Sequence, residues 1–333
     1  MSNLEVGTPA EVDLPARVGL NGPVFERLDP RPVVLTPRTI AVDGNPAGPG
    51  SAAMVQRYLP TRGRRTVGAW CFLDLFGPDD VRGEAGMQIA PHPHSGLQTV
   101  TWLLAGDVRH RDSLGSDQII RPGQLNLMSA GHGIAHAENS PTGHGDQLHG
   151  VQLWIALPDA DRDASPFFEH HEQLPEWRGD GVRARLLMGS LGEVTSPATA
   201  LTPLVGAELE VAAGVEAMVQ LRPDWEHALL VLSGDWSDGT EQLWSGDMAY
   251  LGTGRSELAV HSNAGARLLL LGGEPFDEEL VMWWNFVGRS HDEILAARTA
   301  WMAGQRFGDV AYEGDRLPAP PIPPVTLRPR GRR

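Results

Sequence analysis

Residues 86–138 read GMQIAPHPHSGLQTVTWLLAGDVRHRDSLGSDQIIRPGQLNLMSAGHGIAHAE, and this stretch decides both the fold class and the candidate site. It holds two pairs of polar side chains spaced i and i+2, His92 with His94 and His136 with Glu138. In a β-strand that spacing places both members of a pair on one face. If the two strands are neighbours, three imidazoles and one carboxylate converge, which predicts a site for a divalent transition metal.

This donor set narrows the choice of metal. Three nitrogens and one carboxylate oxygen suit Fe(II), Mn, Ni, Cu or Zn, and are too rich in nitrogen for Ca or Mg. Four protein ligands would leave positions on an octahedral ion open for a substrate. The alternative is that these are solvated or structural histidines, because one His-x-His pair is a modest signal. The match between two pairs, the first followed by a β-like run, favours metal ligation.

Composition excludes several other functions. The 333-residue chain has a formal net charge of −15, which argues against direct binding to nucleic acid or an anionic membrane. Because the sequence has no lysine, Schiff-base and P-loop lysine chemistry are excluded. Cys71 is the single cysteine, so intrachain disulfides are excluded, and its apolar neighbours predict a small buried side chain. No signal-peptide pattern or membrane-length apolar run is visible, so we expect a cytoplasmic protein.

The distribution of glycine and proline along the chain is typical of an all-β protein. Its 39 Gly and 27 Pro divide it into short segments typical of strands joined by tight turns. We expect an extended lead-in over residues 1–35, β-domains over 36–160 and 161–312, and a mobile, extended Pro- and Arg-rich tail over 313–333. A weak sequence similarity between LLAGD at 103–107 and LVLSGD at 230–235 indicates a duplicated β-unit.

One helix is expected, over residues 291–303, within the second domain. Ser290 and Glu293 form a capping-box pattern at its start, and Gly304 is the expected C-cap. The apolar residues that share one face of this helix are Ile294, Ala297 and Trp301.

Longer segments of the sequence carry a family resemblance. They are RYLPTRGRRTVGAWCFLDLFGP, PHPHSGLQTVTWLLAG, HRDSLGS, RPGQLNLMSAGHGIAHAE, HGVQLWIALP and WWNFVGRSHDEILAARTAWMAGQRFG. Gly86-x5-His92-x-His94 resembles the first motif of the cupin superfamily, and the segments, taken in this order, resemble the pirin family within it. The resemblance covers roughly residues 35–312.

This resemblance implies two antiparallel cupin (jelly-roll) β-barrels in tandem, with iron bound only by the N-terminal one. The ligand positions of the family fall on His92, His94, His136 and Glu138, all of which match. Fe(II) is therefore the expected metal, with Mn, Ni, Cu or Zn as alternatives.

Some nearby positions depart from the animal members of the family. Ser95 and Gln98 stand where those proteins have Arg and Glu, and His132 stands where they have Arg. His132 lies four residues before His136 and is either a hydrogen-bonding partner behind it or an exposed loop histidine.

Other histidines are expected to lie outside the site. The polar neighbours of His110 predict a turn or the barrel rim, and His144 and His149 are expected in loops. The C-terminal half has isolated histidines, His227 and His261, so its barrel is expected to be metal-free.

Three large side chains are expected on strands that flank the ligands, namely Trp102, Met128 and Trp154. They either line a pocket that accepts an aromatic ligand or pack in the core. Core packing is favoured for at least two of them.

Two classes of function follow from the resemblance. The first is an enzyme with quercetin 2,3-dioxygenase activity, in which Glu138 is a ligand and a proton acceptor for a flavonol-like aromatic substrate. The second is a non-enzymatic, iron-dependent regulator of transcription or metabolism that binds protein partners, with the Arg-rich tail as either a docking peptide or a solvated terminus. A barrel that binds metal but has lost its activity is a third. We expect a monomer.

Overall fold

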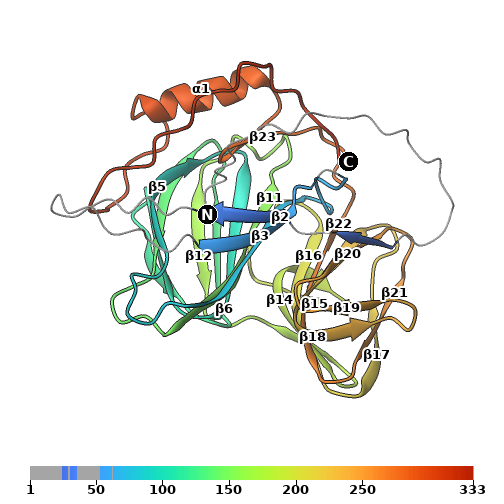
Figure 1. Cartoon of the computed structure of the whole chain (residues 1–333). Helices are drawn as coiled ribbons and strands as arrows, with labels where there is room; N and C mark the ends of the chain where they lie inside the picture. Colours follow the sequence, from blue (N-terminus) through green and yellow to red (C-terminus); the bar gives the residue numbers. More distant parts are fainter. Residues whose placement is uncertain (1–24, 29–30, 36–52, 62, 333) are drawn as a thin grey trace.

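The computed structural model describes residues 25–28, 31–35, 53–61 and 63–332. In this part of the chain the fold is mostly antiparallel β-structure, arranged as two barrels with a single helix over the N-terminal one (Figure 1). The all-β prediction is confirmed. None of the described helical structure is both long and apolar enough to cross a bilayer.

The N-terminal barrel is built from a seven-stranded sheet, in the order β12-β9-β6-β11-β4-β3-β2, and a four-stranded sheet, in the order β5-β10-β7-β8. Its strands are β2 (Arg31–Leu35), β3 (Ala53–Leu59), β4 (Trp70–Asp80), β5 (Gln88–His94), β6 (Leu97–Ala105), β7 (Val108–Asp112), β8 (Asp117–Ile120), β9 (Leu125–Ser129), β10 (Ile134–Asn139), β11 (Gln147–Ala156) and β12 (Phe167–His171). Because β12 pairs with β9, this barrel extends beyond the boundary expected at residue 160.

The C-terminal barrel is one eleven-stranded sheet that curls on itself. Its strands are β1 (Glu26–Leu28), β13 (Glu176–Gly179), β14 (Val182–Leu191), β15 (Val194–Thr195), β16 (Leu204–Val211), β17 (Val215–Gln220), β18 (Glu226–Ser237), β19 (Gln242–Trp244), β20 (Met248–Gly252), β21 (Glu257–Ser262) and β22 (Ala266–Gly273). The expected lead-in thus contributes strands to both barrels, since β1 pairs with β20 and β2 with β3.

Long apolar runs mark the strands at the contact between the barrels. Leu229 and Leu270 face the interior of the C-terminal barrel, whereas Leu230 and Leu271 join an interface core shared with the N-terminal barrel. Strands buried on both faces need apolar residues at successive positions, which explains runs such as LLVL and LLLL. Cys71 belongs to the interface core and is fully buried, as predicted.

The helix α1 (His291–Met302) confirms the predicted helix but covers a different barrel. The Ser290 hydroxyl accepts the N–H of Glu293, and Gly304 follows the helix in the left-handed conformation with φ of 69°. The buried face is the predicted one, made by Ile294, Ala297 and Trp301. It packs with the hairpin β23 (Val281–Trp283) and β24 (Phe286–Gly288) onto the N-terminal barrel through Ala90 and Ala135. Sequence order assigned the helix to the second domain, but this apolar contact joins it to the first.

The C-terminal tail packs against the rest of the described chain. The N–H of Leu317 donates to Pro91 O, and Trp301 Nε1 donates to Leu317 O. Arg330 exchanges two backbone hydrogen bonds with Leu280, and Arg332 reaches the buried carboxylate of Glu226 at 3.2 Å. These contacts contradict a free, solvated tail.

Trp70 joins the two barrels. Its side chain is fully buried, and its indole N–H is shared between Val205 O at 3.1 Å and Gly272 O at 3.2 Å in the C-terminal barrel. A Cβ at Gly206 would lie 2.8 Å from the indole, so glycine is needed where the ring approaches β16.

We therefore expect Trp70→Ala to lower the free energy of unfolding by about 3–5 kcal/mol, because it leaves a cavity at the interface core. Trp244→Ala is the matched control, since Trp244 is 59% exposed on β19; its effect should stay within about 0.5 kcal/mol. Urea unfolding followed by circular dichroism measures both. Equal midpoints for the two variants would contradict this role of Trp70.

Candidate metal centre

Three neighbouring strands of the N-terminal barrel build the site. Strand β10 lies between β5 and β7, with His136 opposite His92 on one side and opposite Asp112 on the other. Glu138 lies opposite His110 on β7. The strands that carry the two i, i+2 pairs are therefore neighbours, and the spacing directs both pairs inward.

The structure brings His92, His94 and His136 together as a buried group. Their candidate ligand atoms all lie within 4.8 Å of one another. The ring centroids are 4.4 Å apart for His92 and His136, 4.9 Å for His94 and His136, and 5.1 Å for His92 and His94. Each side chain is at most 1% exposed. Such a cluster could hold one metal ion.

Hydrogen bonding leaves the ring nitrogens suited to ligation. The Nε2 atoms of His92, His94 and His136 are buried without a hydrogen-bond partner among the described residues. His92 Nδ1 lies 3.0 Å from Ala90 O, and a carbonyl oxygen only accepts, so this nitrogen carries the proton. The Nε2 of neutral His92 therefore presents a lone pair. Unpartnered buried nitrogens are costly, and a metal ion would satisfy them.

Glu138 lies beside the triad rather than within it. Its carboxylate groups with His110 and His136, with candidate ligand atoms within 4.8 Å of one another. It is 2% exposed, and the Thr101 hydroxyl donates to its Oε1 at 3.3 Å. The four predicted ligand positions thus form a histidine triad with a carboxylate next to His136.

The expectation for His110 was wrong. It lies on β7, is 3% exposed, and its Nδ1 is 3.3 Å from Nδ1 of His136. The polar neighbours that suggested a turn, Arg109 and Arg111, are more exposed and alternate with the buried positions of the strand. His110 and Asp112 repeat the i, i+2 spacing of the two ligand pairs, and this was the signal that could have located them.

Asp112 supports His110 from behind. Its Oδ2 lies 3.1 Å from His110 Nε2, and its Oδ1 accepts the N–H groups of Leu114 and Ser116 at 2.9 and 3.0 Å. Burial raises the pKa of this carboxyl, but the hydrogen bonds from His110 and Ser116 outweigh it and lower the pKa below its ordinary value.

The other histidines lie apart from this group. His132 is exposed in a loop and its Nδ1 contacts Ala164 O, so the solvated alternative holds for it. His144 lies in a loop, as expected, whereas His149 is part of β11. His227 on β18 and His261 on β21 belong to the C-terminal barrel. Within the described residues, both candidate metal groups lie in the N-terminal barrel.

The three large side chains have different roles. Trp154 meets His94 edge-on with ring centroids 5.2 Å apart, and it stacks on Phe72 at 4.0 Å. Trp102 instead faces the C-terminal barrel, where its Nε1 donates to Glu208 at 2.7 Å. Met128 packs with Ala130 and Ile134 in a small core cluster. Of the three, Trp154 makes a ring contact with a candidate ligand.

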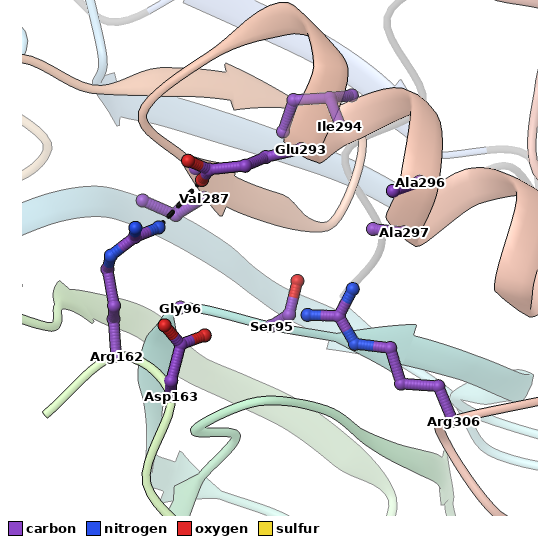
Figure 2. A pocket seen from close by; sticks show the side chains of 11 residues that line it. Ser95, Gly96, Arg162, Asp163, Val287, Glu293, Ile294, Ala296, Ala297 and Arg306 are labelled. Carbon is purple, nitrogen blue, oxygen red and sulfur yellow. Dashed lines mark hydrogen bonds and ion pairs between the residues drawn. The ribbon is translucent and has the colours of Figure 1, made fainter.

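A separate pocket of about 240 Å³ lies next to Ser95, the residue that follows His94 (Figure 2). Its walls come from the β5–β6 turn, the hairpin β23–β24 and α1, together with Arg162 and Arg306. Arg162 pairs with Glu293 across it at 2.6 Å. None of the candidate ligands lines this pocket, so it is distinct from the metal centre.

Comparison with known proteins gives the family. The Pirin family model matches residues 52–155, and the model of the Pirin C-terminal cupin domain matches residues 206–308. The chain belongs to the pirin family. A Pseudomonas aeruginosa pirin relative named "Putative quercetin 2,3-dioxygenase PA1205" is 49% identical over 276 residues, covering 82% of this chain and 87% of that protein. A "Pirin-like protein" from Caulobacter vibrioides is 34% identical, covering 80% and 94% of the two chains.

Solved structures of similar proteins share this fold. A crystal structure of quercetin 2,3-dioxygenase from Acinetobacter baumannii has a TM-score of 0.83 and 40% identity, and the match covers 92% of this pirin and 97% of that chain. The Escherichia coli pirin YhhW, crystallised with nickel(II), has a TM-score of 0.54 and 19% identity, with 67% and 92% coverage. The latter likeness shows the fold alone.

Burial sets the protonation of the triad before any metal binds. It lowers the pKa of His92 to about 4 and holds those of His94 and His136 well below 6.5. At neutral pH this pirin therefore presents uncharged imidazoles, the form that ligates a metal.

The metal-free protein should lose stability as the pH falls from 6.5 toward 4. Over this range the unfolded chain binds protons on its histidines whereas the folded chain does not, so unfolding is favoured at lower pH. Between pH 7.5 and 5 we expect His92 alone to contribute a loss of about 2 kcal/mol. Urea titrations of chelator-treated protein measure this, and His92→Gln should flatten the pH dependence. An unchanged pH dependence in that variant would contradict the assignment.

Proposed function

We propose that this pirin is a mononuclear metal protein, with Fe(II) as the expected ion, held by His92, His94, His136 and Glu138. The observation that carries the proposal is the convergence of three buried imidazoles whose Nε2 atoms have no partner among the described residues. The donor set also accommodates Mn, Ni, Cu and Zn. Nickel(II) in the structure of the E. coli relative supports including it in any metal screen.

We further propose a quercetin 2,3-dioxygenase-type activity on a flavonol-like substrate. The names of the P. aeruginosa relative and the A. baumannii structure support this reaction class. A bound metal would supply a Lewis-acid position where a substrate hydroxyl is oriented for reaction with O2. Glu138 is the proposed acceptor of the hydroxyl proton, and the contact of the Thr101 hydroxyl with its carboxylate supports this role. Trp154 supplies an aromatic surface beside His94.

The regulator hypothesis stays a prediction and depends on the same metal centre. Its proposed docking peptide, the Arg-rich tail, has Arg330 and Arg332 engaged with Leu280 and Glu226 of the same chain. A partner that bound the Arg332 guanidinium would first have to break its contact with Glu226, whereas the contacts of Arg330 with Leu280 are made by its backbone. The tail therefore gives this alternative no support beyond the shared site.

Removal of one imidazole should remove the metal. We expect His92→Ala to bind less than a tenth of the Fe(II) bound by the parent protein, measured anaerobically by elemental analysis after desalting. His261→Ala is the matched control, since its ring lies on β21 of the C-terminal barrel, and it should bind Fe(II) normally. Stoichiometric Fe(II) in the His92→Ala protein would show that the site is wrongly assigned.

The carboxylate should matter for turnover more than for metal retention. Glu138→Gln keeps three imidazoles and an oxygen that accepts from Thr101, but it removes the base, so we expect kcat to fall by about 10²–10⁴-fold. The assay adds O2 and a panel of flavonols to Fe(II)-loaded protein and follows the loss of flavonol absorbance. Glu169→Gln, on β12 of the same barrel, is the control. If the metal-loaded parent protein turns over no flavonol, the enzyme proposal fails for this substrate class.

A further inference from the structure

His110 and Asp112 form a hydrogen-bonded chain that ends on His136. All three side chains are at most 3% exposed. The chain runs from Asp112 Oδ2 to His110 Nε2 over 3.1 Å, and from His110 Nδ1 to His136 Nδ1 over 3.3 Å. Neither His110 nor Asp112 belongs to the histidine triad, and the proposed function assigns them no role.

The direction of each hydrogen bond is determined by the carboxylate end. Asp112 Oδ1 accepts two backbone N–H groups, which can only donate. An ionised carboxylate also accepts at Oδ2, so His110 Nε2 must carry its proton and donate. A neutral imidazole has one N–H, and His110 Nδ1 is then an acceptor. Among the described residues, the group that faces His110 Nδ1 is His136 Nδ1, which must therefore be the protonated nitrogen of His136.

This order leaves the lone pair of His136 on Nε2. That nitrogen is the buried atom without a partner among the described residues, on a ring that packs against His92 and His94. The opposite tautomer would place a proton on Nε2 and block ligation.

We propose that Asp112 and His110 are positioning residues that hold His136 in the tautomer able to ligate a metal through Nε2. The inference rests on the proposed metal centre. Side chains of β7 thus fix the tautomer of His136 in the metal-free protein. His136 then needs no movement of its proton when it binds a metal ion. A ligand that donates its second N–H to an acceptor is also a stronger base and is fixed in orientation.

Asp112→Asn tests the proposal because it should reverse the direction of the hydrogen bonds from residue 112 through His110 to His136. The backbone N–H groups of Leu114 and Ser116 keep the amide oxygen at the position of Oδ1, so the amide NH2 faces His110 Nε2. His110 must then carry its proton on Nδ1 and donate to His136 Nδ1. The proton of His136 moves to Nε2, the position that a metal would occupy.

Two measurements follow from this reversal. Long-range ¹H–¹⁵N NMR spectra of the metal-free protein should show His136 protonated on Nδ1 in the parent and on Nε2 in Asp112→Asn. Zinc, used as a diamagnetic probe in competition with a chelator, should bind the variant about 10–100-fold more weakly. Asp117→Asn, a carboxylate on the adjacent strand β8 that pairs with Arg109, should change neither result.

A second variant guards against misfolding of the first. His110→Phe preserves the stacking on Phe168, where the ring centroids are 4.5 Å apart and 12° from parallel, but provides no acceptor. It should weaken zinc binding to a similar degree while the circular dichroism spectrum of the metal-free protein at 25 °C matches that of Asp117→Asn.

The outcomes separate this proposal from the proposed function. If the parent protein binds no zinc and no Fe(II), the metal centre itself is wrong. If the parent binds zinc but Asp112→Asn keeps the proton of His136 on Nδ1 and binds zinc equally well, the positioning role is overturned. Binding of a second zinc equivalent by His110, His136 and Glu138 would also overturn it, because His110 would then be a ligand rather than an acceptor.

Discussion

The position of β10 between β5 and β7 is the constraint on which the site depends. His136 lies opposite His92 on β5 and opposite Asp112 on β7. The register of β10 therefore determines both the histidine triad and the hydrogen bonds from Asp112 through His110 to His136. A slip of one residue would turn His136 and Glu138 outward and bring Ala135 and Ala137 inward. Ala135 instead packs in the apolar layer beneath α1. Burial on both faces of β10 therefore specifies the register strongly.

The second barrel supports the first through a shared core. Strands β4, β11, β18 and β22 contribute side chains to it, and Trp70 extends from β4 to carbonyl groups of β16 and β22. The buried Glu226 adds a polar connection, accepting the N–H of Gly68 at 2.8 Å and the guanidinium of Arg332 at 3.2 Å. The tail takes part in this connection through Arg332.

The metal-free site is energetically unfavourable for the folded protein. Three imidazoles are buried where they resist protonation, and their Nε2 atoms have no partner among the described residues. A cluster of this kind is poor packing for a barrel core, because each unpartnered nitrogen has lost its hydrogen bond to water. The same features favour a divalent metal, which would satisfy three nitrogens at once without displacing protons.

The sequence by itself determined the all-β class, the capped helix and the two pairs of ligand candidates, because each follows from local spacing, whereas the family was indicated by the resemblance of longer motifs. Alternation at i, i+2 requires only a strand, and the Ser290 cap and Gly304 act within one turn of their helix. Only the tertiary structure decided which barrel α1 covers, where the tail packs, and that Trp102 belongs to the interface whereas Trp154 touches His94. The tertiary structure also decided that His110 lies next to His136. The polar neighbours of His110 are typical of a turn, but the pairing of β7 with β10 makes this segment a strand with alternate residues buried. Those features depend on contacts between segments far apart in the chain, which local spacing does not specify.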